Sequence, residues 1–168
     1  MNRYDNLVGQ TLNNSSAGMA AGTTSTYSIG VSNACIKGKF IAPTPSVTNA
    51  ASPTTDAVTG VAFVPLTANQ ATVLVWGLST SGGAGLIQLM QGSIVPTETG
   101  VTTTAGAFIN APQFPVIPDN IVPLAYCLVR TSPTGSSFTA GTTSWTASGI
   151  TTSTFQNIGT MPDRPQTS

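Results

Sequence analysis

Residues that could carry out acid–base or nucleophilic chemistry are scarce in this chain. It contains no histidine, which removes the usual general base near neutral pH and the commonest metal ligand. A nucleophilic Ser or Cys would then need a lysine or an N-terminal amine as its activator. The lysines are Lys37 and Lys39, and neither a G-x-S-x-G nor an S-x-x-K motif occurs. These residue types predict a protein that is not an enzyme.

Five carboxylates are the remaining candidates for a catalytic pair of the kind that hydrolyses glycosidic bonds. All of them lie in segments that read as turns or termini, where Asp is expected to make local hydrogen bonds. They are Asp5, Asp56, Glu98, Asp119 and Asp163. A hydrolase built on two of them is therefore only the third functional alternative.

Metal and disulfide chemistry are limited in a similar way. Cys35 and Cys127 are too few for a thiolate zinc site, which needs four ligands. The N-terminal residues MNRYDNLVGQ show no apolar run of the signal-peptide type, so we expect both thiols to be reduced and buried. A disulfide between them stays an alternative, as does calcium bound by Asp and loop carbonyls. No metal and no cofactor are predicted.

A glycine-dense loop, residues 79–85, separates two apolar runs in ATVLVWGLSTSGGAGLIQLMQG. A P-loop needs a lysine, and a dinucleotide fingerprint needs G-x-G-x-x-G opening a helix, with an acid about 20 residues later. The loop has neither the lysine nor that glycine spacing, and the nearest acid is Glu98. Apolar alternation resumes at Leu86, so the loop is predicted to be a β-hairpin tip.

Three aromatic residues could stack on sugar rings: Tyr4, Trp76 and Trp145. Trp76 lies in a strongly apolar run, which favours a place in the core. Trp145 lies in the polar run GTTSWTAS, so it is open to two interpretations, a cap over the end of the fold or an exposed sugar-binding ring.

The charge balance restricts the partners. Charged residues make up 6% of the chain and the net charge is zero, whereas an average domain carries roughly 25% charged residues. The sequence lacks the basic patch of a nucleic-acid-binding protein and has no apolar run of the roughly 20 residues that span a membrane. A net charge of zero removes the repulsion that keeps many proteins apart in solution, which a subunit of an assembly tolerates. An ordinary neutral domain is an equally good interpretation of the charge.

The elements that would position these residues are predicted to be strands. The chain has 28 Thr and 17 Ser, and Thr suits a half-buried pleated surface. Apolar alternation places Tyr27, Ile29 and Val31 on one side of a strand at 26–31, and Ile36 and Phe40 on one face of a strand at 35–41. Further strands are expected at 58–65, 71–78, 86–95 (with a bulge at Gly92) and 122–130.

Strand signals at this spacing predict an all-β fold, a single antiparallel β-sandwich or barrel-like domain with extended N- and C-terminal segments. The expected boundaries are an N-terminal arm at 1–25, the domain at 26–160 and a C-terminal tail at 161–168. We expect one of the two ends to lie along a neighbouring subunit, with plain terminal disorder as the alternative. The candidate partner contacts are Arg3, Tyr4, Trp145, Asp163 and Arg164.

Four stretches carry a resemblance: VLVWGLSTSGGAGLIQLMQG, FPVIPDNIVPLAYCLVR, FTAGTTSWTASGIT and FQNIGTMPDRPQ. Together they resemble small virion structural proteins of tailed bacteriophages, of the capsid decoration (cement) or head-fibre type. The resemblance implies a non-enzymatic protein that decorates and stabilises a capsid. It also implies the major capsid protein as partner, a homo-oligomer with a trimer favoured, and a place on the virion surface after assembly in the host bacterial cytoplasm.

The second functional alternative is a carbohydrate-binding or adhesin-type module, such as part of a phage fibre or a pilin-like subunit. A bridge between Cys35 and Cys127 would favour a pilin, and an exposed Trp145 would favour glycan binding.

Overall fold

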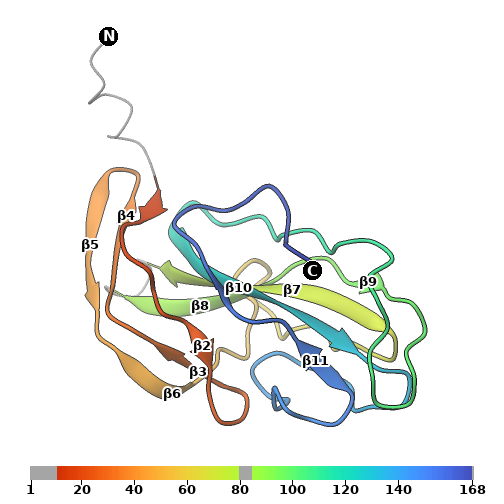
Figure 1. The fold of residues 1–168 in the computed structure, drawn as a ribbon. Helices are drawn as coiled ribbons and strands as arrows, with labels where there is room; N and C mark the ends of the chain where they lie inside the picture. Colours follow the sequence, from red (N-terminus) through yellow and green to blue (C-terminus); the bar gives the residue numbers. More distant parts are fainter. Residues whose placement is uncertain (1–10, 80–84, 168) are drawn as a thin grey trace.

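The computed structural model describes residues 11–79 and 85–167, and these form two layers of antiparallel strands without a helix (Figure 1). The strands are β1 (Leu12–Asn13), β2 (Ala20–Ala21), β3 (Thr26–Ile29), β4 (Ser32–Ile36), β5 (Lys39–Thr44), β6 (Val47–Ala51), β7 (Gln70–Ser79), β8 (Leu86–Gln91), β9 (Val95–Pro96), β10 (Ile121–Thr131), β11 (Ile150–Thr152) and β12 (Gln156–Asn157). The predicted all-β, sandwich-like fold is confirmed, and the sheets do not close into a barrel.

One layer is a three-stranded ribbon made of two short sheets, β1-β4-β5 and β2-β3-β6. The registers show that the two sheets continue each other, because pairing runs from Ile36↔Lys39 beside the turn to Thr26↔Ala51 at the far end. Figure 1 shows this ribbon as the red-to-orange strands on the left. β5 and β6 lie along one edge of the ribbon, and β1 and β2 lie along the other.

The second layer is a larger sheet with the order β11-β10-β7-β8, to which β9 and β12 add short pairs. β7 and β8 pair antiparallel with Ser79 opposite Leu86, which confirms the predicted hairpin; the glycines at 82 and 83 lie outside the described residues. Between Leu74↔Gln91 and Ala71↔Val95 the register changes by one residue. The predicted strand at 86–95 is thus interrupted after β8, where a bulge at Gly92 was expected.

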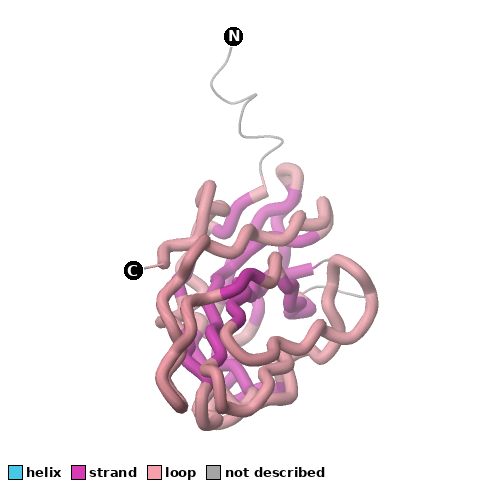
Figure 2. Tube along the Cα trace, turned by 90° about the vertical axis from the view of Figure 1, so that its right-hand side faces the viewer, coloured by secondary structure: helices cyan, strands magenta, loops and turns pink. Residues whose placement is uncertain are grey.

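The larger sheet is buried on both faces, which explains why β7 and β10 are almost continuously apolar. One face packs against the ribbon in a core that contains Trp76, Leu124 and Ile29. The other face, which includes Val75 and Tyr126, is covered by long loops and by the C-terminal residues. Figure 2 shows how much of the chain surrounding the strands is loop.

The predicted strand at 35–41 was wrong, because this stretch is a hairpin. Lys37 and Gly38 both have positive φ, 48° and 77°, as a two-residue hairpin turn of the mirror-image type requires. The chain reverses there, so Ile36 is buried whereas Phe40 is 64% exposed. The two residues do not share a face of one strand.

Two further strand predictions need correction. Residues 58–65 form a loop with isolated bridges, closed by a bond from the Gly60 N–H to the Asp56 carbonyl (2.8 Å). Val31 is exposed, because the alternation changes phase after Ile29 and the inward positions of the next strand begin at Ser32. β-branched residues favour strands, but local turns override that preference in both places.

The boundary of the N-terminal arm also differs from the expected residue 25. Leu12 pairs with Cys35, and Ala21 pairs with Tyr27. Met19 lies in the core. Residues 11–25 are therefore part of the ribbon, and the rest of the predicted arm lies outside the described residues.

Candidate functional site

Trp145 is part of the core. It is 4% exposed, and its ring lies 5.8 Å from that of Trp76 and 5.6 Å from that of Phe138, centroid to centroid. The indole Nε1–H donates to the Thr26 carbonyl at 2.7 Å. A ring buried in this way presents no face to a sugar, so the sugar-binding interpretation of Trp145 is wrong and its ring belongs to the core. Trp76 is fully buried, as expected.

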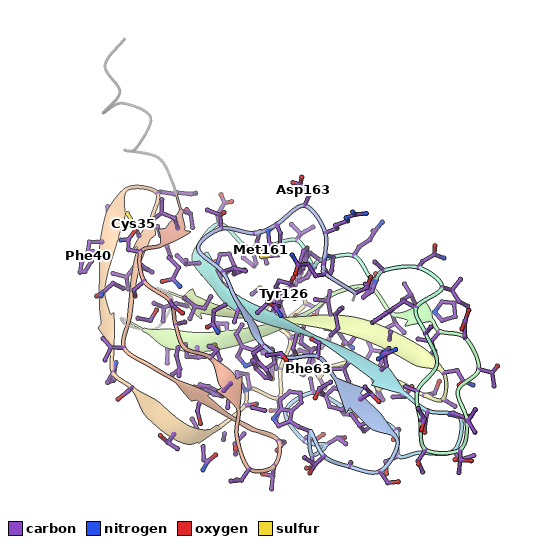
Figure 3. All side chains as sticks on the ribbon, in the orientation of Figure 1. Cys35, Phe40, Phe63, Tyr126, Met161 and Asp163 are labelled. Carbon is purple, nitrogen blue, oxygen red and sulfur yellow. The ribbon has the colours of Figure 1, made fainter. Side chains whose placement is uncertain are left out.

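The C-terminal residues pack on their own chain. Met161 contacts the outer face of the larger sheet, Pro165 is buried, and the Gln166 N–H donates to the Tyr126 hydroxyl at 3.2 Å. Asp163 and Arg164 lie between these anchors in sequence and are exposed; Figure 3 shows Asp163 near Met161. The predicted tail is thus held against the domain within one chain. Arg3 and Tyr4 lie outside the described residues.

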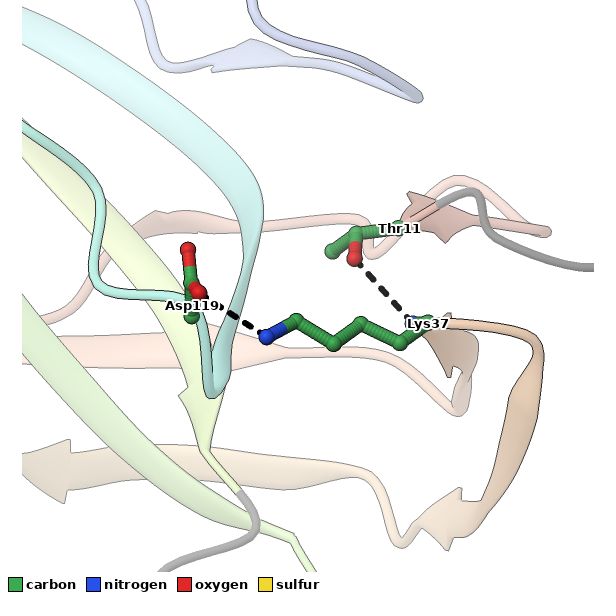
Figure 4. Close-up of polar contacts among 3 residues, drawn as sticks. All are labelled: Thr11, Lys37 and Asp119. Atoms are coloured by element: carbon green, nitrogen blue, oxygen red, sulfur yellow. Dashed lines mark hydrogen bonds and ion pairs between the residues drawn. The ribbon is translucent and has the colours of Figure 1, made fainter.

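Two of the carboxylates, Asp56 and Asp119, make side-chain contacts of different kinds, one within a turn and one between distant parts of the chain. Asp56 accepts from the Val58 N–H (3.0 Å) and the Thr59 hydroxyl (3.2 Å), as expected for Asp in a turn. Asp119 pairs with Lys37 at 2.8 Å (Figure 4). The hydrogen bond and charge of Lys37 lower the pKa of the Asp119 carboxyl, so this acid is ionised near neutral pH and is poorly suited to donate a proton.

No group of three or more potential metal ligands gathers within residues 11–79 and 85–167. Asp119 lines a surface hollow of about 250 Å³ together with Thr11 and Lys37, and the described lining of that hollow includes no second carboxylate. The arrangement can hold an ion pair between the turn of the ribbon and the larger sheet. It does not supply the two acids that glycoside hydrolysis needs.

Both cysteines are free in the structure. Cys127 is buried in the core, and burial raises the pKa of its thiol, since desolvation disfavours the thiolate. Cys35 is half-buried, which differs from the expectation that both would be buried.

The tip of the ribbon carries an outward-facing apolar row, which we call the ribbon row: Leu12 on β1, Cys35 on β4 and Phe40 on β5. Leu12 and Phe40 are both register partners of Cys35, on opposite sides of it. Figure 3 shows Cys35 and Phe40 together at this end of the ribbon. Sequence reasoning missed the row because it interpreted Lys37 and Gly38 as part of a strand. Gly38, a turn-forming residue inside the apolar alternation, was the available signal.

Comparison with known proteins adds no further assignment. The chain matches no protein-family model, no curated protein and no solved structure. In the described part of the chain, no helix has the length and apolar character needed to cross a bilayer.

Proposed function

We propose that this chain is a non-enzymatic virion structural protein that decorates and stabilises a bacteriophage capsid by binding the major capsid protein. The observation that carries the proposal is the ribbon row. It places a large aromatic side chain, Phe40, 64% exposed on a three-stranded sheet. Aromatic anchors of this kind dominate the energetics of protein interfaces.

The surroundings of the row suit an interface. Leu12 and Cys35 are half-buried, whereas Phe40 in the same row is exposed. The row is therefore an apolar surface in which one aromatic ring is the most accessible group. Burying a Phe side chain contributes roughly 1.5–3 kcal/mol. A homo-oligomer, for which we propose a trimer, would repeat this contact in each subunit, and repetition on a lattice multiplies weak contacts into stable attachment.

Binding to undecorated capsids tests the proposal. The purified chain is mixed with undecorated shells assembled from a bacteriophage major capsid protein, and the bound fraction is measured by co-sedimentation. We expect saturable binding by the unchanged chain and at least about tenfold weaker binding by Phe40→Ser, since about 1.4 kcal/mol is one decade of affinity.

Val116→Ser is the matched control, because Val116 is 81% exposed and lies outside the ribbon. If Phe40→Ser and the unchanged chain bind the shells equally well, the ribbon row is not part of the capsid interface. Failure of the folded, unchanged chain to bind any shell would refute the decoration role itself. Light scattering on the free protein gives its mass and tests the trimer.

The carbohydrate-binding alternative loses Trp145 as its binding residue. It is supported by a different observation, a hollow with a polar lining that includes Arg130.

A further inference from the structure

Arg130 is held rigidly near the end of β10. Its guanidinium carbon lies 4.9 Å from the centroid of the Phe108 ring, and Nη1 donates to the Gly106 carbonyl at 2.8 Å. These two contacts orient a planar group that has five N–H donors in total. One donor is used by Gly106, so other N–H groups of the fork are available for a further acceptor.

The charge of Arg130 has no carboxylate partner among the described residues. The single ion pair in that part of the chain joins Lys37 and Asp119. Arg130 itself is half-buried, so solvent screens its charge less than it would on an open surface. A half-buried, oriented guanidinium that has no acid partner among the described residues can accept an anionic group.

Arg130 is one of the residues that line a hollow of about 330 Å³, which we call the Arg130 hollow. Its wall comes from β10, β11, the following turn and the C-terminal segment, and its polar lining includes Thr152, Ser153, Thr154, Gln156 and Gln166. Hydroxyls and side-chain amides both donate and accept hydrogen bonds, which matches the hydroxyl groups of a sugar. The volume is at the lower end of the range for small-ligand sites.

A second hollow, of about 430 Å³, adjoins the first. It contains Arg164 and shares Gln166 and Thr167 with the Arg130 hollow. Two of the chain's three arginines therefore line two hollows that share residues of the C-terminal segment. The arrangement offers room for more than one unit of a chain-like ligand.

We propose that the Arg130 hollow binds the carboxylate-bearing sugar unit of an acidic glycan. The planar fork of Arg130 matches a carboxylate in two-point geometry, and the hydroxyl and amide lining accepts the ring hydroxyls. A nucleic acid would need several phosphate contacts from a row of cations, which one arginine per hollow does not provide. The proposal is independent of the capsid-decoration role.

Titration of the full-length, isotopically labelled protein, followed by NMR, tests this site. The probes are methyl glucuronide, methyl glucoside and N-acetylglutamate amide, which separate the carboxylate from the sugar ring. We expect saturable shifts of the Arg130 Nε–H signal with methyl glucuronide and none with methyl glucoside. N-acetylglutamate amide is expected to bind at least about tenfold more weakly, since it lacks the ring hydroxyls.

Variants assign the binding to this hollow. Arg130→Gln is expected to weaken methyl glucuronide binding at least about tenfold, with folding checked by its spectrum because Arg130 also packs on Phe108. Gln156 is exposed, so Gln156→Ala is expected to leave the core intact. It is expected to reduce the affinity for methyl glucuronide less than Arg130→Gln does. Lys39→Gln removes the same charge from the ribbon and is expected to bind as the unchanged chain does.

Three results would overturn the proposal. They are the absence of any shift with methyl glucuronide, full binding by both Arg130→Gln and Gln156→Ala, and equal affinity for N-acetylglutamate amide, which would identify a protein carboxylate as the partner. Capsid binding is measured separately with Phe40→Ser, so a failure here leaves the decoration role unaffected.

Discussion

At the scale of single residues, the aromatic cluster around Trp145 holds the two layers together. Trp145 comes from the polar 132–149 region, yet its ring meets Trp76 of the larger sheet and Phe155, 5.9 Å away. Its indole N–H reaches Thr26 of the ribbon. One side chain thus links three distant parts of the chain, which is why this tryptophan is buried although its neighbours in sequence are polar.

Replacement of Trp145 by alanine is expected to lower the free energy of unfolding by about 3–5 kcal/mol, the usual cost of removing a large buried ring. Trp145→Phe is expected to lose less than half of that, because it keeps most ring contacts and the Thr26 carbonyl retains its bond from the Gly22 N–H. Urea denaturation measures both. A loss below about 1 kcal/mol for the alanine variant would contradict a core position for this ring.

At the scale of elements, the C-terminal segment acts as a cover for the larger sheet. Sequence alone suggested either a neighbour-binding tail or disorder, since MPDRPQTS contains two prolines and two charges. Neither interpretation considered the apolar outer face of β7 and β10, which needs a cover. Met161 and Pro165 supply part of it.

Deletion of residues 161–168 is therefore expected to destabilise the isolated domain by about 2–4 kcal/mol, from the apolar area that it exposes. Chemical denaturation gives the change, and increased binding of a hydrophobic dye reports the uncovered face. The double variant Asp163→Asn, Arg164→Gln is the control, because it alters the exposed charges and keeps both apolar anchors. Unchanged stability after deletion would mean that the segment does not cover the sheet in solution.

At the scale of the whole molecule, the fold class could be predicted from composition and alternation, because long apolar runs such as 71–78 and 122–130 have few alternatives to buried strands. The hairpin at the tip of the ribbon could not be predicted, because the positive φ angles of Lys37 and Gly38 decide whether one strand or two form. The Arg130 hollow could not be predicted from the sequence either. Its lining residues lie between positions 108 and 167, and no spacing rule relates residues that far apart.

The pH dependence of stability is also a property of the whole molecule, because so few side chains titrate. Without histidine, no side chain with an ordinary pKa titrates between the carboxylates and the thiols. Burial holds the pKa of Cys127 above its unfolded value near 9, and it raises the pKa of Tyr27 as well.

A raised folded pKa stabilises the fold fully below the unfolded value, and that contribution is lost as the pH rises above it. The free energy of unfolding is therefore expected to stay level from about pH 6 to 8 and to fall above about pH 9. Cys127 contributes up to about 1.4 kcal/mol per pH unit to that fall.

Urea denaturation of the unchanged chain and of Cys127→Ala at several pH values isolates the contribution of Cys127 to the pH dependence. The advantage of the unchanged chain must shrink between pH 9 and 10, and a constant difference would show that the Cys127 thiol is not desolvated in the folded protein.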